Sequence, residues 1–510
     1  MNGNGTHFKR RQLLAGLLAT AGTGALADGL ATSPWPIARP VPSEPEGLGQ
    51  SRIPAARPIP SAESLVAKAN LGGKTSFVIA DAKTGEVLEA RNPVLPMPPA
   101  STMKSITALY ALDALGGDFR FRTRLIAAGT VQDGVVNGDL ILAGSGDPTL
   151  DTDAIALLAD KLKSAGVTEV RGKLLTYDGG LPRVPRIDPG QPEHVGYNPT
   201  VSGLNLNFNR VHFEWRRDSS GYNLSMDARS ESHRPPVKIA RMAIADRARP
   251  VYTYRDAGDT DLWTVASAAL GNGGSRWLPV RKPEAYCSEV FRTFARGHGI
   301  TLVPGGPTTS LPDGIVLAEH SSSPLRELLR GMLKFSTNLT AETVGLAASI
   351  ARGRKPETLR ASGTMMESWL DDAMRLNRAI FADHSGLGDQ SRVSASEMVR
   401  LLTRLGPSAD LWPILKEVQM RNWQGQAEPA SRMSVRAKTG TLNFVSALAG
   451  FARGPDGRDL VFSIFSADLA RRATLTKEER DRPEGGASWV RRARQLQARL
   501  LTRWSLVHIT

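Results

Sequence analysis

The chain has 510 residues, which predicts two or three domains rather than one core. Hydrophobic residues make up 41% of the sequence and charged residues 22%, a composition typical of globular proteins. Its formal net charge of +14 suits an anionic wall polymer or lipid surface, or reflects an arginine-rich proteome; we find no nucleic-acid-binding motif. The single cysteine, Cys287, excludes an internal disulfide and a cysteine-cluster metal site.

Residues 1–27 have the pattern of an export signal. Lys9-Arg10-Arg11 supplies the positive region, residues 13–25 form a short apolar run, and Ala25-Leu26-Ala27 fits a cleavage site. The run is too short for a stable membrane span. The arginine pair is typical of twin-arginine export, with the general secretory route as the alternative. We therefore expect a mature protein that works outside the cytoplasm, in the periplasm.

A proline-rich tether follows the signal, and the fold begins after it. Residues 28–60 contain eight prolines, a density that prevents both helix and sheet. Residues 62–69 suit a short helix. Residues 76–80 and 87–90 read as two strands joined by a turn at residues 81–85.

The next helix carries a serine and a lysine on one face. Pro98 and Pro99 end the preceding segment, and the apolar residues that follow recur at helical spacing up to Gly116-Gly117. This places Ser101 in the first turn and Lys104 one turn later. A serine hydroxyl becomes a good nucleophile when a neighbouring base takes its proton. A lysine can be that base only when neutral, which burial or a second cation favours.

Residues 118–312 mix strand and helix patterns, and we interpret them as an α+β insertion. Its expected strands are residues 125–128, 140–143, 170–177, 204–208, 211–215 and 300–303, and its expected helices are residues 154–165 and 288–298. The strand at 204–208 rests on leucine and phenylalanine that alternate with asparagine. Residues 216–260 are polar and weakly patterned, which indicates a small nested excursion near residues 211–274.

Helical patterns return after residue 324, followed by strands and a closing helix. The expected helices are residues 325–335, 343–350 and 393–405, and the expected strands are residues 434–437, 445–451 and 460–465. The closing helix, residues 489–504, contains five arginines. It could lie on a membrane surface, but Leu496, Leu500 and Trp504 favour packing on the sheet.

Three short motifs occur in a fixed order along the chain. Ser101-Thr102-Met103-Lys104 is Ser-x-x-Lys, and Ser336-Thr337-Asn338 is Ser-x-Asn. Lys-Thr-Gly occurs at residues 83–85 and again at residues 438–440. The first copy precedes Ser101 in a hairpin turn, whereas the second follows both other motifs and extends to Thr441. We therefore select Lys438. This ordered set is typical of serine penicillin-recognising enzymes.

With these motifs, residues 61–505 resemble the class C low-molecular-mass penicillin-binding proteins, the D-alanyl-D-alanine carboxypeptidase/endopeptidases. Residues 144–150, 197–209 and 383–387 are also similar to the family pattern, which the chain leaves at His384. The resemblance implies an α+β fold, in which residues 61–117 and 313–510 form a penicillin-binding/β-lactamase-like transpeptidase domain. That domain has an antiparallel sheet flanked by helices, interrupted by the insertion.

The resemblance implies a serine peptidase acting on peptidoglycan stem peptides. Ser101 attacks the carbonyl of a D-alanyl peptide bond and Lys104 takes its proton. Ser336 relays a proton to the leaving amine, and Asn338 holds Lys104 and the substrate amide. The backbone N–H groups of Ser101 and Thr441 form an oxyanion hole. The chemistry requires no metal and no cofactor, and β-lactam antibiotics would acylate the same serine.

The second Lys-Thr-Gly supplies the substrate-binding strand. We expect Lys438 to lower the pKa of Lys104 and to present charge to the substrate carboxylate. Gly440 lets the strand approach the substrate closely. Thr439 and Thr441 offer hydroxyl groups to the same carboxylate. Because the motifs lie outside the insertion, we expect the insertion to position wall substrate or shield the site.

Other classes of protein share parts of this pattern. A β-lactamase would carry the same motifs, although the chain length and the insertion argue against it. A non-catalytic wall-binding protein on the same fold would not need every motif residue. A Ser-His-Asp hydrolase is not supported, because we find no Gly-x-Ser-x-Gly. The motifs do not separate carboxypeptidase from endopeptidase activity and do not indicate an oligomeric state.

Overall fold

The computed structural model describes residues 58–375, 378–405, 410–429 and 431–509. The expected export signal, residues 1–27, lies outside them, as does nearly all of the tether at residues 28–60. Among the described helices, none is both long enough and apolar enough to cross a bilayer.

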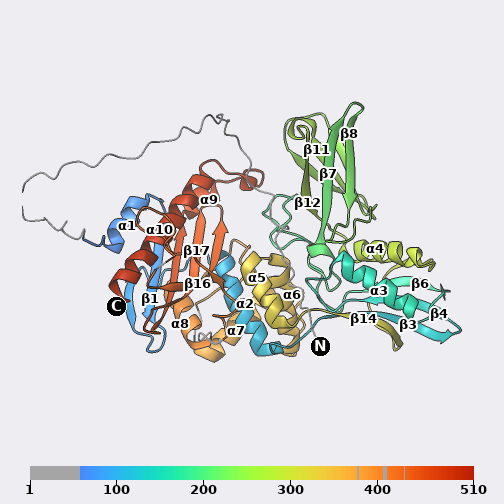
Figure 1. The fold of residues 1–510 in the computed structure, drawn as a ribbon, viewed down its shortest axis with the longest axis horizontal. Helices are drawn as coiled ribbons and strands as arrows, with labels where there is room; N and C mark the ends of the chain where they lie inside the picture. Colours follow the sequence, from blue (N-terminus) through green and yellow to red (C-terminus); the bar gives the residue numbers. More distant parts are fainter. Residues whose placement is uncertain (1–57, 376–377, 406–409, 430, 510) are drawn as a thin grey trace, which may run out of the picture. The chain divides into compact units, whose positions relative to one another are not determined.

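An antiparallel sheet brings the two ends of the described chain together (Figure 1). In spatial order its strands are β15 (Lys416–Glu417), β16 (Ser434–Leu442), β17 (Val445–Arg453), β18 (Asp459–Ala467), β1 (Lys74–Asp81) and β2 (Val87–Arg91). Strand β1 pairs with β18 over its whole length, from Lys74 opposite Ala467 to Asp81 opposite Leu460. The strands predicted at both ends of the sequence are therefore confirmed; each is longer than expected, and β16 extends to Leu442 rather than ending at residue 437.

Helices cover both faces of this sheet. On one face lie α1 (Ala62–Ala69) and α10 (Gly486–Val507). On the other face lie the turn η1 (Ala100–Thr102), α2 (Met103–Leu115), α5 (Leu325–Phe335), α6 (Asn338–Ala351), α7 (Leu359–Met374) and α8 (Ala395–Leu405). Alternate strand residues enter the two cores: Phe77 and Ile79 face α10, whereas Val78 and Ala80 face the larger helical layer.

The closing helix packs on the sheet, as its apolar residues predicted. Leu496, Leu500 and Trp504 of α10 are buried, and the Trp504 ring meets Phe77 edge to face with centroids 5.9 Å apart. Burying a large apolar side chain contributes about 1.5–3 kcal/mol, so this helix is part of the core. The remaining short helices near it are α9 (Leu469–Ala473) and η4 (Glu479–Asp481).

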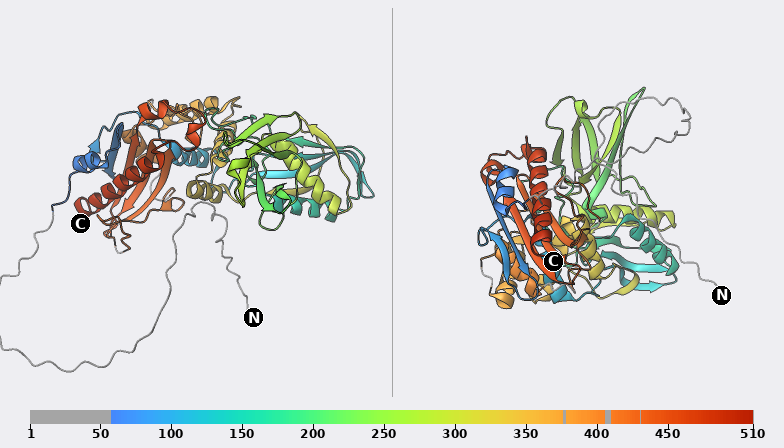
Figure 2. Two further views of the ribbon diagram at one scale, coloured as in Figure 1. Left: turned by 90° about the horizontal axis from the view of Figure 1, so that it is seen from above. Right: turned by 60° about the vertical axis from the view of Figure 1, so that its left-hand side comes forward.

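The middle of the chain forms three further sheets (Figures 1 and 2). The largest contains β13 (Val303–Pro307), β6 (Lys173–Tyr177), β4 (Val135–Ala143), β3 (Arg122–Gln132) and β14 (Ile315–Ser321), with β5 (Glu169–Val170) beside β4. Helices α3 (Thr152–Ser164) and α4 (Pro283–Gly297) share its core. One smaller sheet contains β12 (Gly273–Pro279), β7 (Arg210–Asp218) and β8 (Gly221–Asp227). The other contains β10 (Tyr252–Asp256), β11 (Asp261–Ala266) and β9 (Ala240–Ala245).

The expected insertion ends at residue 312, just before strand β14. Strand β14 pairs antiparallel with β3, from Ile315 opposite Ala127 to Ser321 opposite Arg122. The chain thus enters and leaves the middle region on adjacent strands. Phe119 precedes β3 and Leu325 follows β14. The Leu325 N–H donates to the Phe119 carbonyl at 2.8 Å, which joins the two connecting segments next to the helices.

The predicted strand at residues 204–208 is wrong. This segment is an irregular buried turn that ends in η2 (Asn207–Asn209), where all three residues have positive φ. The Asn209 side chain accepts from the Leu206 N–H at 3.0 Å and donates to the Asn205 side chain at 2.7 Å. Because the asparagines bond to one another and to backbone, they are buried like the leucines, and their alternation does not mark a solvent face.

The middle region also contains strands that were not predicted, and one further predicted strand starts late. The polar residues 216–260 hold β8, β9 and β10, because these small sheets bury little of each strand and leave a weak apolar pattern. The strand expected at residues 300–303 starts only at Val303, whereas Ile300 and Leu302 are buried before it. Helix α7 was not predicted. The strand at 211–215 is confirmed as part of β7.

We predict that Asn209→Ala destabilises the protein by about 2–4 kcal/mol, because it buries an unpaired Leu206 N–H and places alanine at positive φ. Asn137→Ala is the matched control, since Asn137 is an exposed asparagine of β4. Its expected effect is within about 0.5 kcal/mol. Thermal and urea unfolding measure both, and equal losses would contradict the role given to the buried network.

Candidate active site

The serine of Ser-x-x-Lys lies in a tight turn immediately before a buried helix. Ser101 is in η1 and Lys104 is in the first turn of α2. The Met103 N–H donates to the carbonyls of Ala100 and Ser101, which closes the turn. Ser101 is half-buried, whereas Lys104 is completely buried. Ser101 and Lys104 therefore lie on one face, as expected. The serine is partly exposed to solvent, and the lysine is not.

Lys104 has three oxygen partners. Its Nζ lies 3.0 Å from Ser101 Oγ, 2.7 Å from Asn338 Oδ1 and 2.7 Å from the Ser385 carbonyl oxygen. A buried amine needs such partners, because removing it from water without them costs several kcal/mol. The predicted proximity of Ser101, Lys104 and Asn338 is thus observed, and Ser385 is an addition that sequence analysis did not provide.

The Ser-x-Asn motif spans the junction of two helices. Ser336 caps the C-terminus of α5 in the left-handed region, with φ 60° and ψ 37°, and Asn338 begins α6. This sharp turn lets both side chains face the same site from consecutive helices. Asn338 Nδ2 donates to the Tyr197 carbonyl oxygen at 2.8 Å. Because Tyr197 belongs to the middle region, the expected insertion supplies a backbone group next to the motif residues.

The second Lys-Thr-Gly lies on β16, opposite the nucleophile turn. Lys438 Nζ lies 3.0 Å from Ser336 Oγ and 2.7 Å from the Thr439 carbonyl oxygen. Gly440 faces η1 so closely that a Cβ there would lie 2.8 Å from the Pro99 carbonyl oxygen. Only glycine allows this approach of strand to turn. The first copy, by contrast, has Lys83 exposed in the β1–β2 turn.

The hydroxyl residues of that strand are open to solvent next to an arginine. Thr439 and Thr441 are both exposed. Arg494 of α10 donates from Nη2 to Thr441 Oγ1 at 3.3 Å. The guanidinium group places positive charge at this edge of the strand. The sequence contained the closing-helix arginines but gave no sign that one of them reaches the motif.

Burial governs the protonation of both lysines. It lowers the pKa of Lys104 to about 8, while the carboxylates of Glu342 and Asp383 act in the opposite direction. Burial also lowers the pKa of Lys438 to about 6, with repulsion from Lys104 as a further cause. Burial and a second cation were both expected to depress the pKa of Lys104, and the structure gives burial as the cause.

Two buried carboxyl groups complete the surroundings of Lys104. Glu342 is on α6, and burial raises the pKa of its carboxyl group to about 8. Burial likewise raises the pKa of Asp383. Sequence analysis assigned neither a role. The available signal was spacing, because Glu342 follows Asn338 by one helical turn and so projects from the same face.

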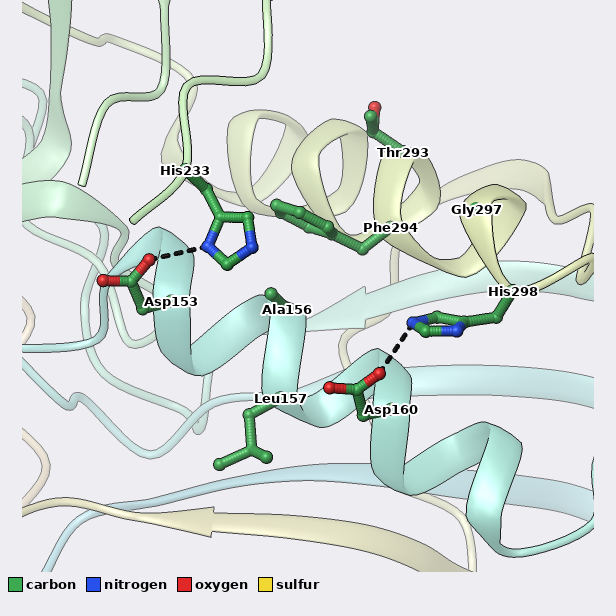
Figure 3. A pocket seen from close by; sticks show the side chains of 9 residues that line it. All are labelled: Asp153, Ala156, Leu157, Asp160, His233, Thr293, Phe294, Gly297 and His298. Atoms are coloured by element: carbon green, nitrogen blue, oxygen red, sulfur yellow. Dashed lines mark hydrogen bonds and ion pairs between the residues drawn. The ribbon is translucent and has the colours of Figure 1, made fainter. Parts of the chain in front are cut away.

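A cavity elsewhere in the described chain lacks this chemistry. Between α3 and α4, a hollow of about 390 Å³ is flanked by two His–Asp pairs (Figure 3). His233 Nδ1 lies 2.8 Å from Asp153, and His298 Nε2 lies 2.9 Å from Asp160. Its lining contains no serine, cysteine or lysine. The Ser101 cluster is therefore the better candidate for nucleophilic chemistry.

The depressed pKa of Lys438 has a consequence for stability. The unfolded side chain titrates near its ordinary pKa, so unfolding takes up a proton between about pH 6 and pH 10. Wild-type stability should therefore rise with pH across that window. We predict that Lys438→Met is more stable than wild type at pH 7, on the order of a few kcal/mol, with the difference vanishing toward pH 10. Urea unfolding at several pH values measures this.

Lys83→Met provides the control, because that side chain is exposed in a turn. It should leave the pH dependence of stability unchanged. A Lys438→Met protein that is less stable than wild type at pH 7 would contradict the cost of desolvation inferred here.

The geometry can be compared with known proteins. The chain is 29% identical to a D-alanyl-D-alanine carboxypeptidase of Actinomadura sp. (strain R39) over 450 residues, 80% of each chain. It is 25% identical to D-alanyl-D-alanine carboxypeptidase DacB of Haemophilus influenzae over 82% of this chain and 92% of that protein. Its fold matches the crystal structure of penicillin binding protein 4 (dacB) from the same organism, with TM-score 0.70 and 22% identity, covering 87% of this chain and 99% of that one. Residues 61–491 match the family model of D-Ala-D-Ala carboxypeptidase 3 (S13), and the chain belongs to that family.

Proposed function

We propose that this serine D-Ala-D-Ala carboxypeptidase acts through an acyl-enzyme on Ser101, with Lys104 as general base. The observation that carries the proposal is the 3.0 Å contact between Lys104 Nζ and Ser101 Oγ, combined with complete burial of the lysine. A base must be neutral to take a proton, and a pKa of about 8 makes a useful neutral fraction available near pH 7. An exposed lysine would be almost wholly protonated.

The remaining motif residues divide the proton transfers between them. In acylation, Ser101 Oγ attacks the carbonyl carbon of the penultimate D-alanine while its proton passes to Lys104. Ser336 then relays that proton from Lys104 to the leaving amine, while Lys438, 3.0 Å away, holds the Ser336 hydroxyl in place. Asn338 holds Lys104 and contacts the substrate amide. In deacylation, water attacks the ester and returns the hydroxyl proton to Ser101.

The tetrahedral intermediate requires donors for its negative oxygen. We assign this role to the backbone N–H groups of Ser101 and Thr441, which the close approach of Gly440 to η1 brings into one region. Each such donor contributes roughly 3–4 kcal/mol to the stability of the transition state. Neither a metal nor a cofactor enters these steps.

We assign recognition of the substrate carboxylate to the side chains of Thr439, Thr441, Lys438 and Arg494. Lys438 was expected to supply the charge, but at 2% exposure and with a pKa of about 6 it has little charge to offer before substrate binds. Arg494, beside Thr441, supplies a guanidinium group suited to a carboxylate. A cross-link through meso-diaminopimelate also presents a carboxylate beside the scissile bond, so the same site suits endopeptidase cleavage.

The middle region is proposed to position wall substrate. The Tyr197 carbonyl orients the Asn338 amide, so this region supports the site through backbone rather than through a reacting side chain. We further propose that the protein acts in the periplasm, exported by the signal-like residues 1–27. Peptidoglycan, which would be its substrate, lies outside the cytoplasm, and this agrees with the export pattern.

Ser101→Ala should abolish covalent labelling by fluorescent penicillin, because the atom that forms the ester is removed. Lys83→Ala, in the rejected motif copy, should label within about two-fold of wild type, as expected for an exposed turn residue. Persistent labelling of Ser101→Ala would sink the nucleophile assignment. Rapid nitrocefin turnover by wild type would instead favour the β-lactamase alternative, and an unlabelled wild type the wall-binding one.

Carboxylate recognition can be measured with matched peptides that end in a D-alanine acid or its amide. Losing one charge-assisted contact predicts an acid-to-amide ratio in kcat/KM of about 10 to 150. Arg494→Gln should lower kcat/KM for the acid and shrink this ratio, whereas Arg491→Gln, an exposed change on the same helix, should not. A ratio of one in wild type would exclude carboxylate recognition by this strand.

A further inference from the structure

The three partners of Lys104 differ in what they can do. The Asn338 amide oxygen and the Ser385 backbone carbonyl can only accept hydrogen bonds, whereas the Ser101 hydroxyl can also donate one. Both acceptors lie 2.7 Å from Nζ, and the hydroxyl lies 3.0 Å from it. An ammonium group would fill all three positions with N–H donors.

A neutral amine has two N–H groups and one lone pair, so the partners must be shared differently. The two carbonyl oxygens claim the two N–H groups, because neither can donate to the lone pair. The lone pair is then left for the Ser101 hydroxyl, which can donate. Asn338 cannot exchange its oxygen and nitrogen without cost, because Nδ2 is held by the Tyr197 carbonyl at 2.8 Å. The pair of acceptors therefore aims the base at the nucleophile.

The Ser385 carbonyl is held in place by a carboxylate on the helix of Asn338. Glu342 Oε2 accepts from the His384 N–H at 2.9 Å, and Oε1 accepts from the Ser385 N–H at 2.9 Å. Glu342 is completely buried. One face of α6 thus carries both the amide that contacts Lys104 and the carboxylate that fixes the loop contacting it.

The same loop is anchored from other helices. Thr107 of α2 donates to the His384 carbonyl at 2.7 Å, and Ser362 of α7 lies 2.7 Å from His384 Nε2. The imidazole lies directly on Gly345, where a Cβ would come within 2.2 Å of the ring. The glycine of α6 thereby makes room for His384, the residue at which the sequence leaves the family pattern.

We propose that Glu342 is a positioning residue for the general base. By holding the Ser385 carbonyl, it completes the pair of acceptors that orients the lone pair of neutral Lys104 toward Ser101. Glu342 acts through the loop and touches neither the nucleophile nor the substrate. The inference rests on the proposed roles of Ser101 and Lys104.

The test compares Glu342→Gln, Glu342→Asp and wild type by the second-order rate constant of acylation by penicillin between pH 5 and pH 10. Glutamine replaces one acceptor oxygen with a donor, and aspartate is too short to reach both N–H groups. Either change should displace the Ser385 carbonyl. The acylation rate constant at its high-pH plateau should then fall by about 10- to 100-fold, as expected for a misplaced catalytic group. Aspartate also covers the case in which Glu342→Gln fails to fold.

The pH at which the acylation rate constant rises, the rising limb of its pH profile, is a second readout. Loss of structure would not shift it. That limb reports the ionisation of the essential base. The charged groups facing Lys104 are Glu342 on α6, Asp383 in the loop and Lys438 on β16. Removing the Glu342 carboxylate should shift the limb to lower pH in Glu342→Gln. Glu342→Asp, which keeps the charge, should shift it less.

Glu397→Gln is the matched control for structural cost. Glu397 is also buried, and it accepts the Ser394 N–H at 2.9 Å at the start of α8. It should lower the Tm without changing the acylation profile. If Glu342→Gln also lowers only the Tm and retains the wild-type plateau and limb, the positioning role is overturned. The proposed function would fail separately, through continued labelling of Ser101→Ala.

Discussion

An amine removed from water needs an oxygen partner for each of its protons, and Lys104 meets this requirement with groups from three separate segments. The contacts that make burial tolerable also set the reactivity. Desolvation lowers the pKa of the lysine toward neutrality, and the surrounding acceptors determine where its lone pair points. The stability of this arrangement and its chemistry therefore have the same physical origin.

The rest of the fold brings those segments within reach. Pairing of β1 with β18 joins the two ends of the described chain, so the helix that follows β2 packs beside helices encoded more than two hundred residues later. The left-handed residue Ser336 turns α5 into α6, and Gly440 lets β16 approach η1. The middle region closes the assembly through the Tyr197 carbonyl. Each constraint is a backbone feature that a change of side chain alone would not reproduce.

The buried site also balances its charge. Two lysines lie in it, and two carboxyl groups, Glu342 and Asp383, lie near Lys104. Burial opposes the charged form of each, so the net charge can stay low while protons move between the groups. His384 does not disturb this balance, because burial lowers its pKa to about 3 and keeps it neutral. Its departure from the family pattern therefore alters packing against Gly345 rather than charge.

Local order along the chain was enough to select Ser101 and Lys104, which the structure brings into contact. Ser101 and Lys104 are one helical turn apart, and the sequential order of the motifs separated Lys438 from the exposed Lys83. The period-2 and helical patterns likewise predicted both ends of the main sheet and its covering helices except α7. These predictions depend only on neighbouring residues, because the alternation of apolar and polar residues shows which side of a helix or strand faces solvent.

Tertiary structure decided what depends on contacts between distant residues. The asparagines at residues 204–209 imitate a strand because burial through mutual hydrogen bonds leaves no solvent face. The cause of the lowered pKa of Lys104 depends on burial, which a motif does not express. Glu342 meets the loop at Ser385 across more than forty residues. Such a contact follows from chain packing, because neither residue is unusual in its own sequence surroundings.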